Sequence, residues 1–317
     1  MGEFDLIKRY FTRATPSALL GIGDDAALLR VNPGNVLAVS TDMLVCGTHF
    51  LPDADPFLLG HKTLAVNLSD LAAMGAEPRW AVLAIALPEA DEAWLAQFSA
   101  GFFALAQQHG VELVGGDTTR GPLNLCVTIF GDVPAQQALR RSGAQVGDDI
   151  WVSGRLGDAA LALAHLQGRI VLPDEEIDSC APALHQPQPR VALGLALRGI
   201  ASSAIDISDG LLADLGHILD ASQVGAEIDF AALPLSPSMQ AHAAQPLVRQ
   251  CILAGGDDYE LCFTAPAARH EELADIAARL DVPLTRIGKV VAGRGCIVRD
   301  AAGNPLNVET GGYEHFR

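Results

Sequence analysis

The stretch TLAVNLSDLAAMGAEPRWAVLAIALP, residues 63–88, joins a helical pattern to a strand pattern. Residues 57–75 carry apolar side chains at helical spacing, and Gly75 and Pro78 mark the end of that helix. Residues 80–88 form a continuous apolar run of the kind found in buried strands. A helix followed at once by a buried strand indicates an α/β layer.

The same alternation continues along the chain. In the first half we predict strands at 36–44, 110–119 and 125–133 and a second helix at 91–109. In the second half we predict helices at about 157–167 and 190–199, the latter after a Pro-rich connector, and strands at 150–154, 204–208, 226–230, 260–264 and 295–300. This pattern predicts an α/β (α+β) protein.

Length and composition divide this protein into two domains. At 317 residues the chain exceeds the usual size of a single core. The composition becomes polar between residues 134 and 147, with a turn at Gly147. We therefore predict an N-terminal domain over residues 1–138 and a C-terminal domain over residues 139–317.

The charge balance restricts the partners. The chain has 38 Asp and Glu residues against 21 Lys and Arg residues, a formal net charge of −17. Nucleic acids and acidic membranes both require clustered positive charge, so we expect neither as a partner. If the ligand is anionic, bound metal cations must neutralise it. The acidic charge balance therefore predicts a metal site if the ligand carries phosphate.

The cysteines and the N-terminus indicate the compartment. Six cysteines are scattered without a CxxC pair, which favours reduced core residues over disulfides or a zinc site. The N-terminus has no apolar signal core. The longest uncharged run, residues 93–111, reads as an amphipathic helix rather than a membrane span. We expect a cytoplasmic protein.

Aspartates gather at the ends of the predicted elements. Asp70 lies in an otherwise apolar helix near its last turn, where the helix dipole repels a negative charge. The other candidates are Asp24 and Asp25 in a turn, Asp42 at a strand end, Asp117 after a strand and two glycines, and Asp206, Ser208 and Asp209 between a strand and a helix. Ligands of α/β proteins bind outside the carboxyl ends of strands.

Each of these residues also has a structural alternative. Asp70 could face solvent or pair with Lys62, and Asp209 could cap the helix that follows it. Asp24 and Asp25 could simply form a turn. If the carboxylates do converge, two of them about 4 Å apart repel by roughly 4 kcal/mol at an effective dielectric near 20, which favours a bound cation. An all-oxygen ligand set favours Mg²⁺ or Mn²⁺.

Magnesium held by aspartates most often serves phosphates. The sequence has no GxxxxGK[ST], HRD or DFG motif, so it is neither a P-loop enzyme nor a protein kinase. The glycines of GGDTT, residues 115–119, could let backbone N–H groups approach phosphate oxygens. The sequence therefore predicts a different phosphate-binding architecture.

Nine motifs in one order carry a resemblance that extends nearly from end to end. They are GIGDDAAL, STDMLVCGTHF, KTLAVNLSDLAAMGAEP, GGDTT, RSGAQVGDDIWVSG, LGD, AIDISDGLLADL, GGDDYELCFT and GGYEHF. Together they resemble the thiamine-monophosphate kinase family, which is related to aminoimidazole ribonucleotide synthetase and selenophosphate synthetase. The resemblance implies a two-domain synthetase-like fold whose N-terminal domain forms a barrel across a homodimer. It also implies ATP-dependent phosphorylation of thiamine monophosphate to thiamine diphosphate.

The resemblance assigns roles to individual residues. It implies several Mg²⁺ ions, with ligands at Asp25, Thr41, Asp42, Asp70, Asp117, Asp206 and Asp209. Within this set the catalytic residues would be Asp25, Asp42, Asp70, Asp117 and Asp209. ATP contacts would fall on Gly116, Asp117, Arg141 and Ser208, and substrate contacts on His49, Asp257 and Tyr313. The family usually reads GGED where this chain reads GGDD, so Asp257 is one methylene shorter than the expected glutamate.

The hypothesis for the reaction is direct in-line transfer of the γ-phosphoryl group of ATP. The acceptor phosphate is already ionised at neutral pH, so the reaction requires no strong general base, and cations offset the repulsion between the two phosphates. Three alternatives stay open: a sister ATP-dependent synthetase, a metal-dependent phosphohydrolase, and a non-catalytic acidic metal-binding protein.

Overall fold

The computed structural model describes residues 2–306, which are arranged in two compact units with one sheet each. Unit 1 takes residues 1–71 and 76–136, and unit 2 takes residues 72–75 and 137–317. The predicted domain limit at residue 138 lies two residues beyond this division. The mixed α/β fold class predicted from the sequence is confirmed.

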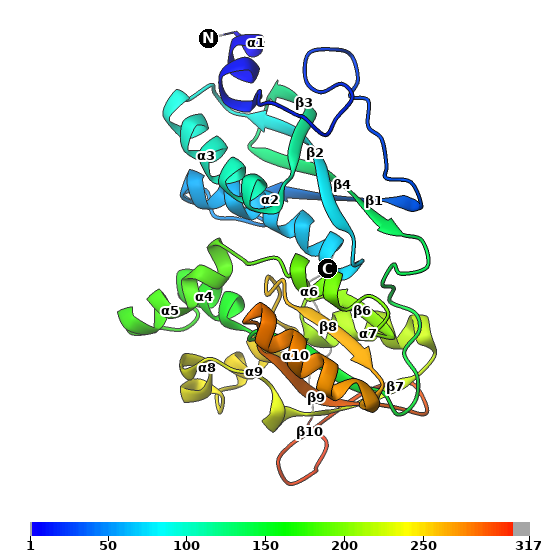
Figure 1. Cartoon of the computed structure of the whole chain (residues 1–317). Coiled ribbons are helices and arrows are strands. Elements are labelled where there is room, and N and C mark those ends of the chain that lie inside the picture. The colour runs from blue at the N-terminus through cyan, green and yellow to red at the C-terminus, as the bar shows by residue number, and fades with distance from the viewer. Residues whose placement is uncertain (1, 307–317) are drawn as a thin grey trace. The chain divides into compact units, whose positions relative to one another are not determined.

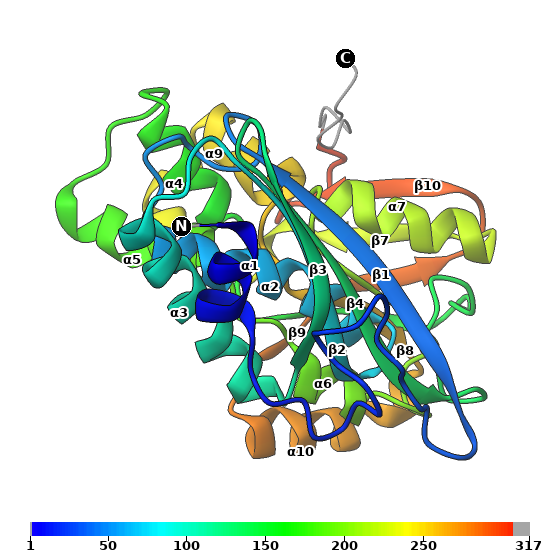
Figure 2. The ribbon, with the colours of Figure 1, turned by 90° about the horizontal axis from the view of Figure 1, so that it is seen from above.

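Unit 1 is built on a four-stranded sheet in the order β1-β4-β2-β3 (Figures 1 and 2). Strand β3 runs parallel to β2, and the other neighbours are antiparallel. The elements of this unit are α1 (Glu3–Leu6), the π-helix η1 (Ile7–Phe11), β1 (Asn35–Val45), α2 (Pro56–Ala73), β2 (Glu77–Leu87), α3 (Glu92–His109), β3 (Glu112–Arg120) and β4 (Asn124–Pro134).

Helices α2 and α3 lie on one side of this sheet (Figures 1 and 2). They approach closely because two glycines face the partner backbone: a Cβ on Gly60 would lie 2.1 Å from the Phe98 carbonyl, and one on Gly101 would lie 1.9 Å from the Phe57 carbonyl. Leu68 and Phe102 are fully buried in this layer. No helix among residues 2–306 is long and apolar enough to cross a membrane.

The opposite face of the unit 1 sheet, here called the open face, keeps apolar side chains exposed. On β1, Leu37, Val39 and Met43 are 42%, 55% and 52% exposed. Side chains alternate along a strand, so these three point away from the neighbouring residues Ala38 and Ser40. An apolar strand surface of this kind ordinarily contacts another protein surface.

Unit 2 contains a six-stranded sheet in the order β10-β7-β9-β5-β8-β6. Its core includes Ile150, Leu161, Leu215 and Ile252. The elements are β5 (Asp149–Ser153), α4 (Asp158–Leu166), α5 (Asp174–His185), α6 (Val191–Ala196), β6 (Ser203–Asp206), α7 (Leu211–Ser222), β7 (Gly225–Asp229), η2 (Phe230–Ala232), α8 (Pro237–His242), α9 (Pro246–Ala254), β8 (Leu261–Ala265), η3 (Ala267–Arg269), α10 (His270–Leu280), β9 (Leu284–Val291) and β10 (Gly295–Arg299).

Two predicted strand ends differ from the structure. Asp42 lies inside β1, which continues to Val45. Asp117 lies inside β3, and the two glycines before it belong to the strand instead of a turn. A bulge beside Val82 shifts the register between β2 and β3 next to these glycines. From the sequence we predict no helix or strand at the positions of α5, α8, α9, α10 and β9.

Candidate functional site

Asp70 is a partly exposed residue within a largely buried stretch of helix α2. Residues 59–69 and 71–73 of α2 are buried, whereas Asp70 is half-buried. The Ser40 hydroxyl of β1 donates a hydrogen bond to Asp70 Oδ2 at 2.5 Å. One turn earlier on the same helix, the Asn67 side-chain oxygen accepts a hydrogen bond from the Asp42 amide at 3.2 Å. The carboxylate therefore sits where α2 meets the edge strand β1.

Strand alternation separates the predicted metal ligands of unit 1. Ser40 and Asp42 lie on the face of β1 that α2 covers, whereas Thr41 lies on the open face and its hydroxyl bonds to Thr128. Asp117 pairs with Ala84, which pairs with Cys126, and Cys126 pairs with Met43 on the open face. Asp117 therefore shares the open face with Thr41, across the sheet from Asp70.

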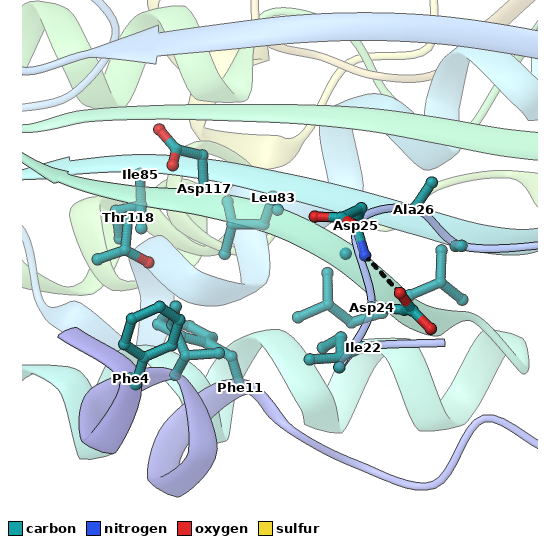
Figure 3. A pocket seen from close by; sticks show the side chains of 17 residues that line it. Phe4, Phe11, Ile22, Asp24, Asp25, Ala26, Leu83, Ile85, Asp117 and Thr118 are labelled. Atoms are coloured by element: carbon teal, nitrogen blue, oxygen red, sulfur yellow. Dashed lines mark hydrogen bonds between the residues drawn. The ribbon is translucent and has the colours of Figure 1, made fainter. Parts of the chain in front are cut away.

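A cavity of about 570 Å³ runs along β3 in unit 1 (Figure 3). This volume is within the usual range for small-molecule sites. Its polar lining is Asp24, Asp25, Asp117 and Thr118, and its apolar lining includes Phe4, Phe11, Ile22, Leu83 and Ile85. In Figure 3, Asp117 and Thr118 leave β3 on opposite sides of the strand. Gly116 and Asp117, both predicted ATP contacts, lie in the wall of this cavity.

Gly116 is required by the sheet itself. A Cβ at this position would lie 2.0 Å from the Leu83 carbonyl oxygen of β2. No real Cβ makes so close a contact, so a larger residue would push the two strands apart. Gly116 thus allows close strand pairing, and together with Gly115 it leaves a bare backbone beside the cavity.

The loop that carries Asp24 and Asp25 is tied to the sheet at its base. The Ser17 amide donates to Glu112 Oε1 of β3 at 2.9 Å, and Trp80 donates to the Ser17 hydroxyl at 2.8 Å. Further along, Leu20 and Leu28 form a β-bridge that closes the loop. The predicted turn at Asp24 and Asp25 is confirmed, and the Asp25 amide donates to Asp24 Oδ1 at 3.1 Å (Figure 3).

His49 follows β1 in a tight turn. The Val45 amide donates to His49 Nδ1 at 3.0 Å, and the His49 amide donates back to the Val45 carbonyl at 2.9 Å. Because Nδ1 accepts a hydrogen bond, the neutral ring carries its proton on Nε2. The turn therefore fixes the orientation and the tautomer of this predicted substrate residue.

In unit 2, Asp206 ends β6 and is buried, and Ser208 and Asp209 follow it immediately before α7. The backbone N–H groups of Ser208, Asp209 and Gly210 all donate to one oxygen, Asp214 Oδ2, at 3.0, 3.0 and 3.1 Å. Asp214 is buried in the first turn of α7. Burial raises the pKa of Asp214 to about 7 against the lowering effect of these hydrogen bonds.

The GGDD loop, residues 255–258, is joined to this segment by its backbone. The Asp257 amide donates to the Ser208 carbonyl at 2.9 Å, and the Tyr259 amide donates to the Ile207 carbonyl at 2.8 Å. Asp257 has φ = +68°, a conformation that Asp adopts more readily than most residues. Its carboxylate accepts a hydrogen bond from the Tyr259 hydroxyl at 3.0 Å. The shorter side chain is thus held by an internal contact.

Buried charges surround the GGDD loop. Asp258 accepts two hydrogen bonds from the Gly157 amide at the start of α4, and burial raises its pKa well above the ordinary value. Glu260 accepts from Arg190 at 2.6 and 2.5 Å and from the Ser153 hydroxyl at 2.5 Å. Two carboxylates of this motif therefore shape the loop, which leaves Asp257 as its candidate ligand-binding residue.

Arg141 lies apart from the other predicted ATP contacts of unit 2. Its carbonyl accepts a hydrogen bond from Ser222, the last residue of α7, whereas Ser208 and Asp209 precede the first residue of that helix. Twelve helical residues span about 18 Å. The structure brings Asp206, Ser208, Asp209 and Asp257 together and sets the Arg141 backbone at the other end of α7. Tyr313 lies outside the described residues.

The donor set fits magnesium in its chemistry. Every predicted ligand offers oxygen, and Mg²⁺ prefers oxygen ligands. Among residues 2–306 no three His, Cys, Asp or Glu side chains gather closely enough to hold a metal ion by themselves. Mg²⁺ usually keeps several waters and binds through one or two carboxylates together with substrate phosphates. The dispersed aspartates therefore suit ions that arrive with a nucleotide.

Sequence reasoning missed two residues that support the site. Asp214 lies in the motif AIDISDGLLADL, four residues after Gly210. An acid at this place, in the first turn of a helix, is the sequence feature that could have identified it. Arg190 lies in a Pro-rich connector and pairs with a residue 70 positions away. No local pattern announces such a contact.

Family models match both halves of the chain. The model for the AIR synthase related protein, N-terminal domain, matches residues 23–133, and the model for the corresponding C-terminal domain matches residues 145–301. The chain is thus a two-domain AIR synthase related protein.

Relatives narrow the class. Thiamine-monophosphate kinase of Escherichia coli (strain K12) is 50% identical over 321 residues, covering 99% of this chain and 98% of the relative. The crystal structure of thiamine-monophosphate kinase from Stenotrophomonas maltophilia K279a has a TM-score of 0.87 at 52% identity, covering 94% and 96% of the two chains. AaThiL complexed with AMPPCP and TMP has a TM-score of 0.79 at 31% identity, covering 99% and 97%. The chain belongs to the thiamine-monophosphate kinase family.

Proposed function

We propose that this protein transfers the γ-phosphoryl group of ATP to thiamine monophosphate, giving thiamine diphosphate. The observation that carries the proposal is the end-to-end likeness to AaThiL complexed with AMPPCP and TMP. It is supported by a cavity of suitable size beside Gly116 and Asp117 and by aspartates at the ends of β6 and α2.

The proposed mechanism is an in-line displacement. The attacking oxygen belongs to a phosphate that is already ionised, so the protein must chiefly orient two anions and offset their repulsion. Mg²⁺, when bound with ATP, would supply the positive charge that this acidic protein lacks. Several ions would be held, and their proposed ligands are Asp25, Thr41, Asp42, Asp70, Asp117, Asp206 and Asp209.

The protein's own groups would align the reactants. Gly116 offers a bare backbone and Asp117 a carboxylate at the cavity along β3, and both remain our proposed nucleotide contacts. Ser208 and Asp209 lie on a loop fixed by three hydrogen bonds. Arg141 stays a proposed nucleotide contact, separate from the Ser208 loop. His49, Asp257 and Tyr313 are the proposed contacts for thiamine monophosphate.

The acceptor test uses purified protein with ATP and Mg²⁺. We expect thiamine monophosphate to be converted to thiamine diphosphate, and unmodified thiamine to react poorly because it lacks the attacking phosphate oxygen. Phosphate release without an acceptor would indicate a phosphohydrolase instead. If no candidate acceptor is phosphorylated while an amide or selenide is activated, a sister synthetase is the better assignment.

Tyr313 provides a sharper test of the substrate side. We propose that its ring packs against thiamine monophosphate, so Tyr313→Ala is expected to raise KM for thiamine monophosphate at least about tenfold and to leave KM for ATP nearly unchanged. Tyr313→Phe is the matched control, because it keeps the ring. Equal increases in both KM values would contradict this role.

We also propose that the protein is a homodimer formed through the open face. Leu37, Val39 and Met43 leave an apolar strand surface exposed on β1, and burying it against a second copy would remove it from water. Val39→Asp is expected to convert a dimer into a 33 kDa species in sedimentation at micromolar concentration. A parent protein that already sediments at 33 kDa would refute the dimer.

We also propose a reducing, cytoplasmic location, which is supported by six cysteines that form no disulfide.

A further inference from the structure

The Ser208–Gly210 loop depends on one buried carboxylate. Three consecutive backbone N–H groups point at Asp214 Oδ2, and all three distances lie between 3.0 and 3.1 Å. The Asp214 amide in turn donates to the Gly210 carbonyl at 3.0 Å. Asp214 thus contacts this loop through both its side chain and its backbone amide.

A simple helix cap does not account for this arrangement. A usual capping residue precedes the helix and accepts from N–H groups inside its first turn. Asp214 instead lies inside α7 and reaches back to Gly210 and to the two residues before it, which are outside the helix. Gly210 has φ = +118°, and a Cβ there would lie 2.7 Å from the Ala254 carbonyl carbon, so the path of the loop is narrow. The bond from the Gly210 N–H resembles half of a capping box, whereas the bonds from Ser208 and Asp209 hold backbone that precedes the helix.

The loop held by Asp214 carries the proposed ligand-binding residues that precede α7 in unit 2. Ser208 and Asp209 are the proposed nucleotide and metal contacts, and the Ser208 carbonyl accepts the Asp257 amide. Resting on the proposed function, we propose that Asp214 is a positioning residue: it acts through the backbone of residues 208–210 to orient Ser208 and Asp209 toward the nucleotide.

The test compares Asp214→Ala with Asp214→Asn. Alanine removes the acceptor, whereas asparagine keeps one oxygen for the three N–H groups. We expect Asp214→Ala to speed hydrogen exchange in a peptide covering residues 207–211 and to weaken calorimetric binding of AMPPCP with Mg²⁺ about 100-fold, as a misplaced contact would. In the kinase assay kcat should fall and KM for ATP should rise, with a smaller change in KM for thiamine monophosphate. Asp214→Asn should recover binding to within about tenfold.

Asp149→Asn is the matched control for loss of a buried aspartate. Asp149 lies on β5 and contacts His270 and Arg286, none of which belongs to the proposed site. We expect this variant to lose stability without a change in nucleotide affinity or in exchange at residues 207–211. If Asp214→Ala does not fold, Asp214→Leu, which also removes the acceptor but keeps the side-chain volume, takes its place in the same measurements.

Two results would overturn the proposal. Exchange at residues 207–211 that is unchanged in both Asp214 variants would mean that the carboxylate does not hold the loop. Faster exchange with parental nucleotide binding and turnover would mean that the loop position is irrelevant to function. The proposed function can fail separately: a parent that makes no thiamine diphosphate but binds AMPPCP with Mg²⁺ in an Asp214-dependent way would leave the positioning role intact.

Discussion

The candidate ligand aspartates of unit 1 differ in exposure from the buried aspartates of unit 2. In unit 1, Asp24, Asp25 and Asp117 line a cavity and Asp70 is half-buried beside one hydroxyl. In unit 2, Asp158, Asp206 and Asp214 are buried, and burial raises the pKa of Asp158 and Asp214. Exposed acids retain their charge for a ligand, whereas buried acids need hydrogen bonds or a cation from the protein. The first group is therefore suited to binding. In the second group Asp158 and Asp214 are bonded within the protein and are suited to shaping loops, whereas Asp206 remains a proposed Mg²⁺ ligand.

The strongest test of this difference is Asp70→Asn. An amide cannot supply the same charge to Mg²⁺, so turnover is expected to fall about 100-fold or more, equivalent to about 2.7 kcal/mol. The asparagine oxygen can still accept the Ser40 hydrogen bond, and one negative charge is removed. The metal-free variant should therefore melt at the parental temperature or higher in calorimetry. Full activity in Asp70→Asn would contradict the assigned role.

Arg190→Met is the corresponding test in unit 2, with stability as its readout. The substitution leaves Glu260, whose side chain is 9% exposed, without its cation. Loss of one partner from a largely buried ion pair is expected to lower the free energy of unfolding by about 3 kcal/mol in urea titration. The double variant Arg190→Met with Glu260→Gln should recover part of that loss. A single variant as stable as the parent would mean that the pair does not support the GGDD loop.

The smallest expected effect concerns pH and Asp149. Burial raises the pKa of Asp149, but hydrogen bonds from His270 and Arg286 outweigh it and leave the pKa below the ordinary value. Its contribution to stability is therefore present above the unfolded pKa of about 4 and is lost as the pH falls through the lower folded value. Asp149→Asn should lose about 1 kcal/mol at pH 7, because its partners His270 and Arg286 are both half exposed.

The pH dependence of that difference is the measurement. Urea midpoints of the parent and of Asp149→Asn should converge as the pH is lowered from 5 to 2. A difference that stays constant over this range would mean that the carboxylate charge contributes nothing and that only the shape of the side chain matters.

The sequence by itself determined the α/β class, the alternation of helices and strands in the first half, and the acidic residues that bear on phosphate chemistry. These features follow from local periodicity and composition, which need only neighbouring residues. The apolar run around Asp70 predicted a carboxylate with a special environment, and the Ser40 contact supplies one. Ordered motifs predicted the family, which the relatives confirm.

Only the tertiary structure decided which acids line a cavity and which are buried. Strand β3 extends through Asp117, the strand register sets this residue on the face opposite Asp70, and α7 separates the Arg141 backbone from Ser208. Asp214 and Arg190 gained their roles from residues brought near by folding, such as a loop backbone and a carboxylate 70 positions away. Such contacts depend on how strands pair and helices pack, and these pairings join residues that a local pattern cannot connect.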